Sequence, residues 1–178
     1  MSGDIPQTCP SCRFCDSRSR TLATALAARQ HPLVGRIPRY LLDGTFHHVT
    51  ARATGDHALF VDDDDRKEFM ALLRHSTRRW RWTIHAFCLM TTHYHLVIEA
   101  PLERLSRGMH RLSLMYATGF NERHRRRGRL FADRFASFVI NDEEHFERAC
   151  EYVLQNPVKA GLCSRADDWR WSSYGSPF

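Results

Sequence analysis

Four short stretches of this chain are predicted to be strands, and apolar and polar positions begin to alternate near Thr45 in the first of them. They span residues 45–51, 82–90, 94–99 and 135–140. The first is rich in β-branched and aromatic residues and follows Gly44, as strands do. The second and third are separated by little more than Thr91 and Thr92, which predicts a hairpin, and Pro101 ends its second arm.

Three other segments repeat apolar residues every three or four positions, which predicts helices. The first follows Asp62–Asp65, and Asp65 with Glu68 resembles a capping box. A capping role explains this acidic cluster better than a metal site does. The second helix has an apolar stripe of Leu105, Met109, Leu112, Tyr116 and Phe120.

The third helix is predicted to open with a capping box of Asn141 and Glu144 and to end at Asn156, because Pro157 follows. The resulting order is strand, helix, strand, strand, helix, strand, with one more helix. This order predicts an α+β protein of the ferredoxin-like split β-α-β class, with an antiparallel sheet and helices on one face. We expect this domain at residues 38–178, after a flexible leader at 1–37.

Charge narrows the choice of partner. The formal net charge is +6, and Lys67 and Lys159 are the only lysines, so 24 of the 26 basic residues are arginines. A net positive charge favours a polyanionic partner, most simply nucleic acid. The planar guanidinium of arginine can bind a phosphate through two hydrogen bonds, which suits this partner. The sequence shows neither a secretory signal nor a run of about 20 apolar residues, so a cytoplasmic protein without a membrane partner is expected.

Two histidines in the third strand are the main candidates for metal binding. His93 and His95 are two positions apart and therefore point to the same face, where both could bind one divalent ion. Paired histidines are also common as plain surface residues. His47 and His48 are adjacent, face opposite ways and cannot bind one ion together.

The third helix carries a candidate nucleophile. Tyr152 lies one turn before Asn156, so an amide oxygen there could complete a two-nitrogen, one-oxygen metal site beside the phenol. A tyrosine with its usual pKa of about 10 is a poor nucleophile, so a metal would have to make phosphorus more electrophilic. The alternative for Tyr152 is packing, which is also how Tyr116 is interpreted.

Other clusters of polar residues leave alternatives open. Residues 121–129 hold five arginines and are followed by Phe131, Arg134 and Phe135, which suits phosphate and base contacts but also a solvated surface. Cys9, Cys12 and Cys15 have the spacing of a zinc site but lack an evident fourth ligand, so a leader without metal is favoured. Cys88, Cys150 and Cys163 lie among apolar neighbours, as core residues do.

Seven motifs, in this order, resemble the IS200-like tyrosine transposases, and among them the REP-associated branch of the HUH endonucleases. They are residues 46–52, 86–99, 120–124, 128–131, 134–135, 152–162 and 169–174. The resemblance implies a ferredoxin-like fold, Mg²⁺ or Mn²⁺ on His93, His95 and Asn156, and Tyr152 as nucleophile. It covers about residues 38–174, and the cysteine leader lies outside it.

The expected function is therefore that of a single-stranded DNA endonuclease and strand transferase. It would act on hairpin, REP-like DNA through a 5′-phosphotyrosine, as in DNA transposition, and be a monomer or a homodimer. The expected DNA contacts are Arg123, Arg125, Arg126, Arg127, Arg129, Arg134 and Lys159. One alternative is a domesticated hairpin-binding protein or repressor that does not cleave. Another is an RNA-binding ferredoxin-like module, although the RRM aromatic motif is missing.

Overall fold

The computed structural model describes residues 45–174 and 178, so the leader and its three cysteines lie outside the described residues. The elements in chain order are β1 (Phe46–Arg52), α1 (Asp63–Trp80), β2 (Thr83–Leu89), β3 (His93–Glu99), α2 (Leu102–Arg123), β4 (Ala136–Val139), α3 (Glu143–Lys159) and a 3-10 helix, η3 (Ala166–Asp168). This order confirms the predicted α+β class and the split β-α-β pattern.

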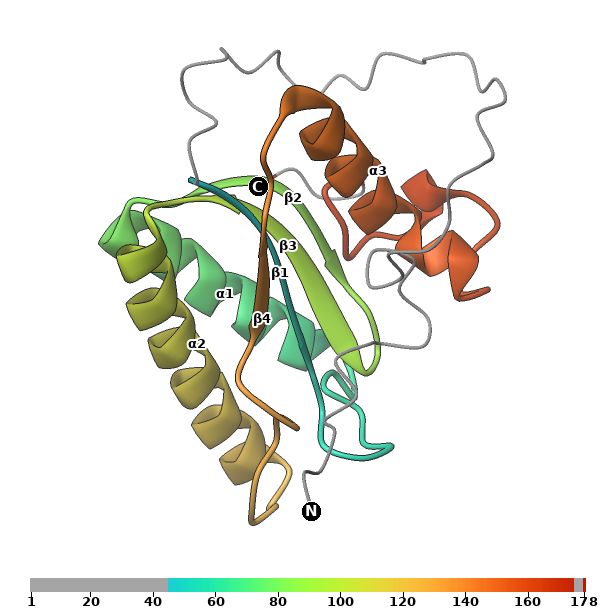
Figure 1. Ribbon diagram of the computed structural model, residues 1–178. Coiled ribbons are helices and arrows are strands. Elements are labelled where there is room, and N and C mark those ends of the chain that lie inside the picture. The colour runs from blue at the N-terminus through green and yellow to red at the C-terminus, as the bar shows by residue number, and fades with distance from the viewer. Residues whose placement is uncertain (1–44, 175–177) are drawn as a thin grey trace, which may run out of the picture. The chain divides into compact units, whose positions relative to one another are not determined.

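The four strands form one antiparallel sheet in the order β2-β3-β1-β4. Helices α1 and α2 cover one face of it, as predicted, and the additional helix α3 lies on the other face (Figure 1). The core between the sheet and α1 and α2 includes Val49, Leu96 and Ile98 from the central strands. The opposite face packs against α3, which contacts β2 and β3.

Alternation along β3 divides its residues between these two faces. Tyr94 is fully buried on the α1 and α2 side, where its ring lies 4.8 Å from that of Phe69. Its neighbours His93 and His95 therefore point to the α3 side, because the side-chain period of a strand is two. The strand pattern thus places both candidate ligands between the sheet and α3.

The start of α1 differs from the prediction in its details. Asp62 is the N-cap and accepts hydrogen bonds from the backbone N–H groups of Asp64 and Asp65, and the Asp65 side chain accepts from the N–H of Asp62. The capping box therefore pairs Asp62 with Asp65, and the predicted pairing of Asp65 with Glu68 is wrong. The interpretation of the acidic cluster as a cap holds.

Helix α3 begins and ends later than expected. Its N-cap is Asp142 rather than Asn141, since the Asp142 carboxylate accepts from the N–H of His145 at 2.7 Å. The helix continues through Pro157 to Lys159, so the prediction that it ends at Asn156 is wrong.

Capping hydrogen bonds at the C-terminal end of α3 explain why the helix continues past Pro157. Gly161 has a φ of 69° and donates to the carbonyl of Val158, while Leu162 donates to the carbonyl of Pro157. This pair of bonds is a Schellman motif, which stabilises a last turn that the proline alone disfavours. The extra turn brings Lys159 onto the helix. Within the described ranges, no helix has both the length and the apolar composition needed to cross a membrane.

Candidate active site

The two histidines of β3 lie side by side on the face that α3 covers. Their ring centres are 5.0 Å apart, and the rings are nearly perpendicular. His93 Nδ1 is 3.0 Å from the hydroxyl of Thr92, and His95 Nδ1 is 3.0 Å from Nε2 of His48. Each histidine thus uses Nδ1 for a neighbour in the protein, and Nε2 is the ring nitrogen that could bind a metal.

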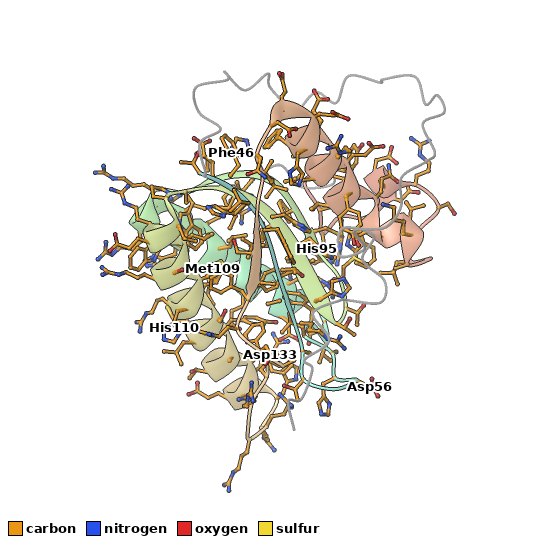
Figure 2. All side chains as sticks on the ribbon, in the orientation of Figure 1. Phe46, Asp56, His95, Met109, His110 and Asp133 are labelled. Carbon is orange, nitrogen blue, oxygen red and sulfur yellow. The ribbon has the colours of Figure 1, made fainter. Side chains whose placement is uncertain are left out.

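Helix α3 brings Tyr152 against these histidines, and Figure 2 shows His95 between the sheet and α3. The Tyr152 ring centre lies 5.6 Å from that of His95 in an edge-to-face arrangement. Asn156, one turn later, donates from Nδ2 to the Tyr152 carbonyl at 2.8 Å. This bond uses the amide nitrogen, so Oδ1 is the atom that could bind a cation. Three of the four predicted residues thus meet through their rings, and Asn156 is fixed to the backbone of Tyr152.

Two further residues join this cluster. His48, from β1, stacks on His95 with ring centres 5.2 Å apart and lies 5.9 Å from the Tyr152 ring. Lys159, which the sequence placed only among the DNA contacts, has Nζ 4.5 Å from the centre of the Tyr152 ring. The contact between Lys159 and Tyr152 was not predicted, although the two residues are seven positions, about two helical turns, apart.

Burial keeps the three imidazoles uncharged near neutral pH. It is the largest cause that lowers the pKa of His48, to about 4, with a further contribution from His145. Burial also holds the pKa of His95 well below its usual value, and electrostatic interactions with His48, His93 and Lys159 lower it further. The pKa of His93 is lowered by burial and then by Arg52. A neutral imidazole has the lone pair that metal binding needs.

The donor set fits a divalent cation. Two neutral imidazole nitrogens and one amide oxygen leave other coordination positions for water or phosphate, as a catalytic site for Mg²⁺ or Mn²⁺ requires. The assignment of His93, His95 and Asn156 as ligands and of Tyr152 as nucleophile remains a prediction.

A second group of side chains, Asp62, Asp65 and His124, also has ligand atoms within 4.8 Å of one another. These atoms already have protein partners. Both carboxylates are ion-paired with Arg123, Asp65 at 2.9 Å, and His124 Nε2 is 2.9 Å from Asp65. A guanidinium in this position neutralises the charge that would attract a cation. We interpret this group as a clamp between the start of α1 and the end of α2.

The predicted DNA-binding arginines differ in their surroundings. Arg123 belongs to that clamp, Arg126 donates to the Asn121 side chain at 3.1 Å, and Arg129 donates to the carbonyl of Ala132. Arg125, Arg127 and Arg134 are exposed, as are Arg123 and Arg129.

The loop that carries these arginines reaches the end of the sheet where the candidate ligands begin. The N–H of Ala132 donates to the carbonyl of Arg52, and Arg52 is the register partner of His93. The loop after α2 therefore runs beside the end of β1 that pairs with His93.

A ferredoxin-like α+β domain with a cluster of histidines facing a helical tyrosine is the class that the fold and the site define. A family model described as transposase IS200-like matches residues 44–156, which is more than half of the chain. The chain belongs to the IS200-like transposase family. The matched segment contains all four residues predicted for the site.

A solved structure described as a REP-associated tyrosine transposase bound to a REP hairpin is similar in fold. It is 16% identical, with a TM-score of 0.62, over 79% of this chain and 83% of the other. At this identity the likeness confirms the fold alone. No curated protein matches the chain.

Proposed function

We propose that this protein is a single-stranded DNA endonuclease and strand transferase that acts on hairpin, REP-like DNA through a 5′-phosphotyrosine. The observation that carries the proposal is the packing of Tyr152 against His95, beside His93 and one turn before Asn156. Membership of a transposase family and the hairpin named for the similar structure support DNA as the substrate.

Tyr152 supplies the nucleophile. Its phenolic oxygen attacks phosphorus and forms the P–O bond of the phosphotyrosine, while the bond from phosphorus to the 3′-oxygen breaks. The phenolic proton leaves to solvent, and the departing 3′-oxygen takes up a proton. In the reverse step a 3′-hydroxyl attacks the phosphotyrosine, so strands are rejoined without an external energy source.

His93, His95 and Asn156 would hold Mg²⁺ or Mn²⁺ through Nε2, Nε2 and Oδ1. The ion would make the phosphorus more electrophilic and neutralise charge on the phosphate. The protein positions these donors before the substrate arrives. Burial keeps the imidazoles neutral, and the bond from Asn156 to the Tyr152 carbonyl orients the amide.

The exposed arginines Arg125, Arg127 and Arg134 would contact the hairpin backbone, and Lys159 would contact DNA at Tyr152 itself. Phosphate contacts of this kind set the register of the DNA, and bases beside the stem would be read by stacking and by their edges. Binding should therefore weaken steeply as salt rises.

The test is incubation with a library of single-stranded DNA hairpins and Mg²⁺ or Mn²⁺, followed by a denaturing gel and peptide mass mapping. A metal-dependent adduct on Tyr152 is expected, and Tyr152→Phe should abolish the adduct but keep hairpin binding. Tyr116→Phe is the matched control, because that buried hydroxyl only donates to the carbonyl of Leu59 at 2.7 Å. Cleavage that survives in Tyr152→Phe would contradict the proposal, and tight binding without any adduct would favour the non-cleaving repressor.

A further inference from the structure

A buried histidine pair links the two central strands beneath Tyr152. Nε2 of His48 in β1 and Nδ1 of His95 in β3 are 3.0 Å apart, and the rings are stacked with only 21° between their planes. His48 is fully buried and His95 is 4% exposed. The pairing of Thr50 with His95 and of His48 with Val97 sets this contact, so the separation of the rings is fixed by the sheet.

The contact has two chemically distinct forms. When both imidazoles are neutral, one proton lies between the two nitrogens. If His48 donates from Nε2, His95 accepts at Nδ1 and carries its own proton on Nε2, where no metal can bind. If His95 donates from Nδ1, its Nε2 has a free lone pair, and the proton of His48 sits on Nδ1.

We infer that His48 is a positioning residue that accepts a hydrogen bond from Nδ1–H of His95 and so keeps Nε2 of His95 unprotonated for metal binding. The inference rests on the proposed function, in which His95 is a ligand. A metal-bound histidine usually gives its other N–H to an acceptor in the protein, which fixes both the tautomer and the orientation of the ring. His48 provides that acceptor for His95.

The surroundings of His48 fix the position of its ring. Phe138 and Tyr152 lie against it, with ring centres at 6.1 and 5.9 Å. In this position Nε2 of His48 faces Nδ1 of His95.

The tautomer can be read directly in the metal-free protein. Long-range ¹H–¹⁵N NMR spectra of imidazole-labelled protein at pH 7.5 distinguish Nδ1–H from Nε2–H for each histidine. We expect His95 as the Nδ1–H form in the unmodified protein and a mixture of forms in His48→Leu. A wild-type His95 that carries its proton on Nε2 would overturn the inference.

Mn²⁺ affinity, measured by calorimetry on the metal-free chain, gives the second readout. His48→Leu should bind 10- to 100-fold more weakly, and His48→Gln, which offers an acceptor oxygen, should recover most of the loss. His47→Leu is the matched control, because His47 is equally buried but faces the other way and contacts Ser137.

The outcomes separate the inference from the proposed function. If His48→Leu is folded by circular dichroism and binds Mn²⁺ as the wild type does, His48 has no positioning role, and the proposed function stands. If the wild type binds Mn²⁺ no more tightly than His93→Ala does, the proposed metal site fails, and the positioning role of His48 fails with it whatever the tautomer of His95.

Discussion

The ammonium nitrogen of Lys159 lies 4.5 Å from the centre of the Tyr152 ring, so a positive charge sits on the face of the candidate nucleophile. A cation there can stabilise the ring contact and the negative charge that develops on the phosphate. We predict that Lys159→Met, which keeps the aliphatic stem, lowers the single-turnover cleavage rate of a hairpin substrate by about 10- to 100-fold. Tyr152 should remain in place.

The other lysine of the chain provides the control for this prediction. Lys67 is exposed on α1 and pairs with Asp64 at 2.7 Å. Lys67→Met removes the same charge and should leave the rate unchanged. Equal cleavage rates in both variants would show that Lys159 does not act on the reaction.

The arginines after α2 should divide into structural and DNA-binding residues. Both Arg123 and Arg127 are exposed, but Arg123 pairs with Asp62 and with the fully buried Asp65. We predict that Arg123→Gln lowers the free energy of unfolding by about 1–2 kcal/mol, because a buried carboxylate loses one of its partners. Chemical denaturation measures this change.

Arg127→Gln should show the opposite behaviour. Its free energy of unfolding should match that of the wild type, while its affinity for a hairpin falls. The slope of log affinity against log salt concentration should decrease by about one, because one phosphate contact is lost. A loss of DNA affinity in Arg123→Gln at unchanged stability would reverse the two assignments. The sequence alone could not separate these arginines, because the run from residue 121 to 129 does not reveal which of them meets a carboxylate from α1.

Periodicity in the sequence was sufficient to predict the sheet and the two helices that cover it. The stripe from Leu105 to Phe120 has the helix period and faces the core. Strands β1 and β3 are buried on both faces, so their apolar runs mark them as strands without showing which face meets which helix. The errors fall at the helix ends. There, single side-chain bonds such as that from Asp142 to His145 decide the boundary, and Pro157 is tolerated because Gly161 closes the next turn.

Only part of the candidate site could be predicted from the sequence, because spacing relates residues within one element and not residues of different elements. His93 and His95 share a strand, and Tyr152 and Asn156 share a helix, so spacing relates the members of each pair. His48 is 47 residues from His95, and only the antiparallel pairing of β1 with β3 brings their rings together. Contacts set by strand register do not show in local spacing, so the contact between His48 and His95 could not be predicted from the sequence.

The three described cysteines should react at different rates. Burial raises the pKa of Cys150 to about 12 and that of Cys88 further. The pKa of Cys163 is also raised, but this thiol is only partly covered, whereas the other two are buried. Since the thiolate is the reactive form, a pKa of about 12 leaves roughly one thiol in ten thousand ionised at pH 8. We predict that iodoacetamide labels Cys163 first, and labels Cys88 and Cys150 at comparable rates only after unfolding. Peptide mass mapping measures the extent of labelling at each cysteine. Early labelling of Cys150 in the native protein would contradict the prediction that its thiol is buried.

Two glycines of α2 should respond in opposite ways to alanine. A Cβ at Gly108 would meet the indole of Trp82 and lie 2.8 Å from Trp80, and Trp82 is almost fully buried. A Cβ at Gly119 would meet only the carboxylate end of Glu68, which can move. Alanine is favoured over glycine in a helix by about 1 kcal/mol, while forcing a methyl group into a packed core costs about 1–3 kcal/mol.

We therefore predict that Gly108→Ala lowers the free energy of unfolding by up to about 2 kcal/mol and that Gly119→Ala raises it by about 0.5–1 kcal/mol. Urea denaturation followed by circular dichroism measures both. Because α2 covers the face of the sheet opposite to Tyr152, cleavage by folded Gly108→Ala should match the wild type. A stabilised Gly108→Ala would mean that the indole of Trp82 moves aside, and a cleavage defect in the folded variant would mean that packing under α2 reaches the histidines on the other side of the sheet.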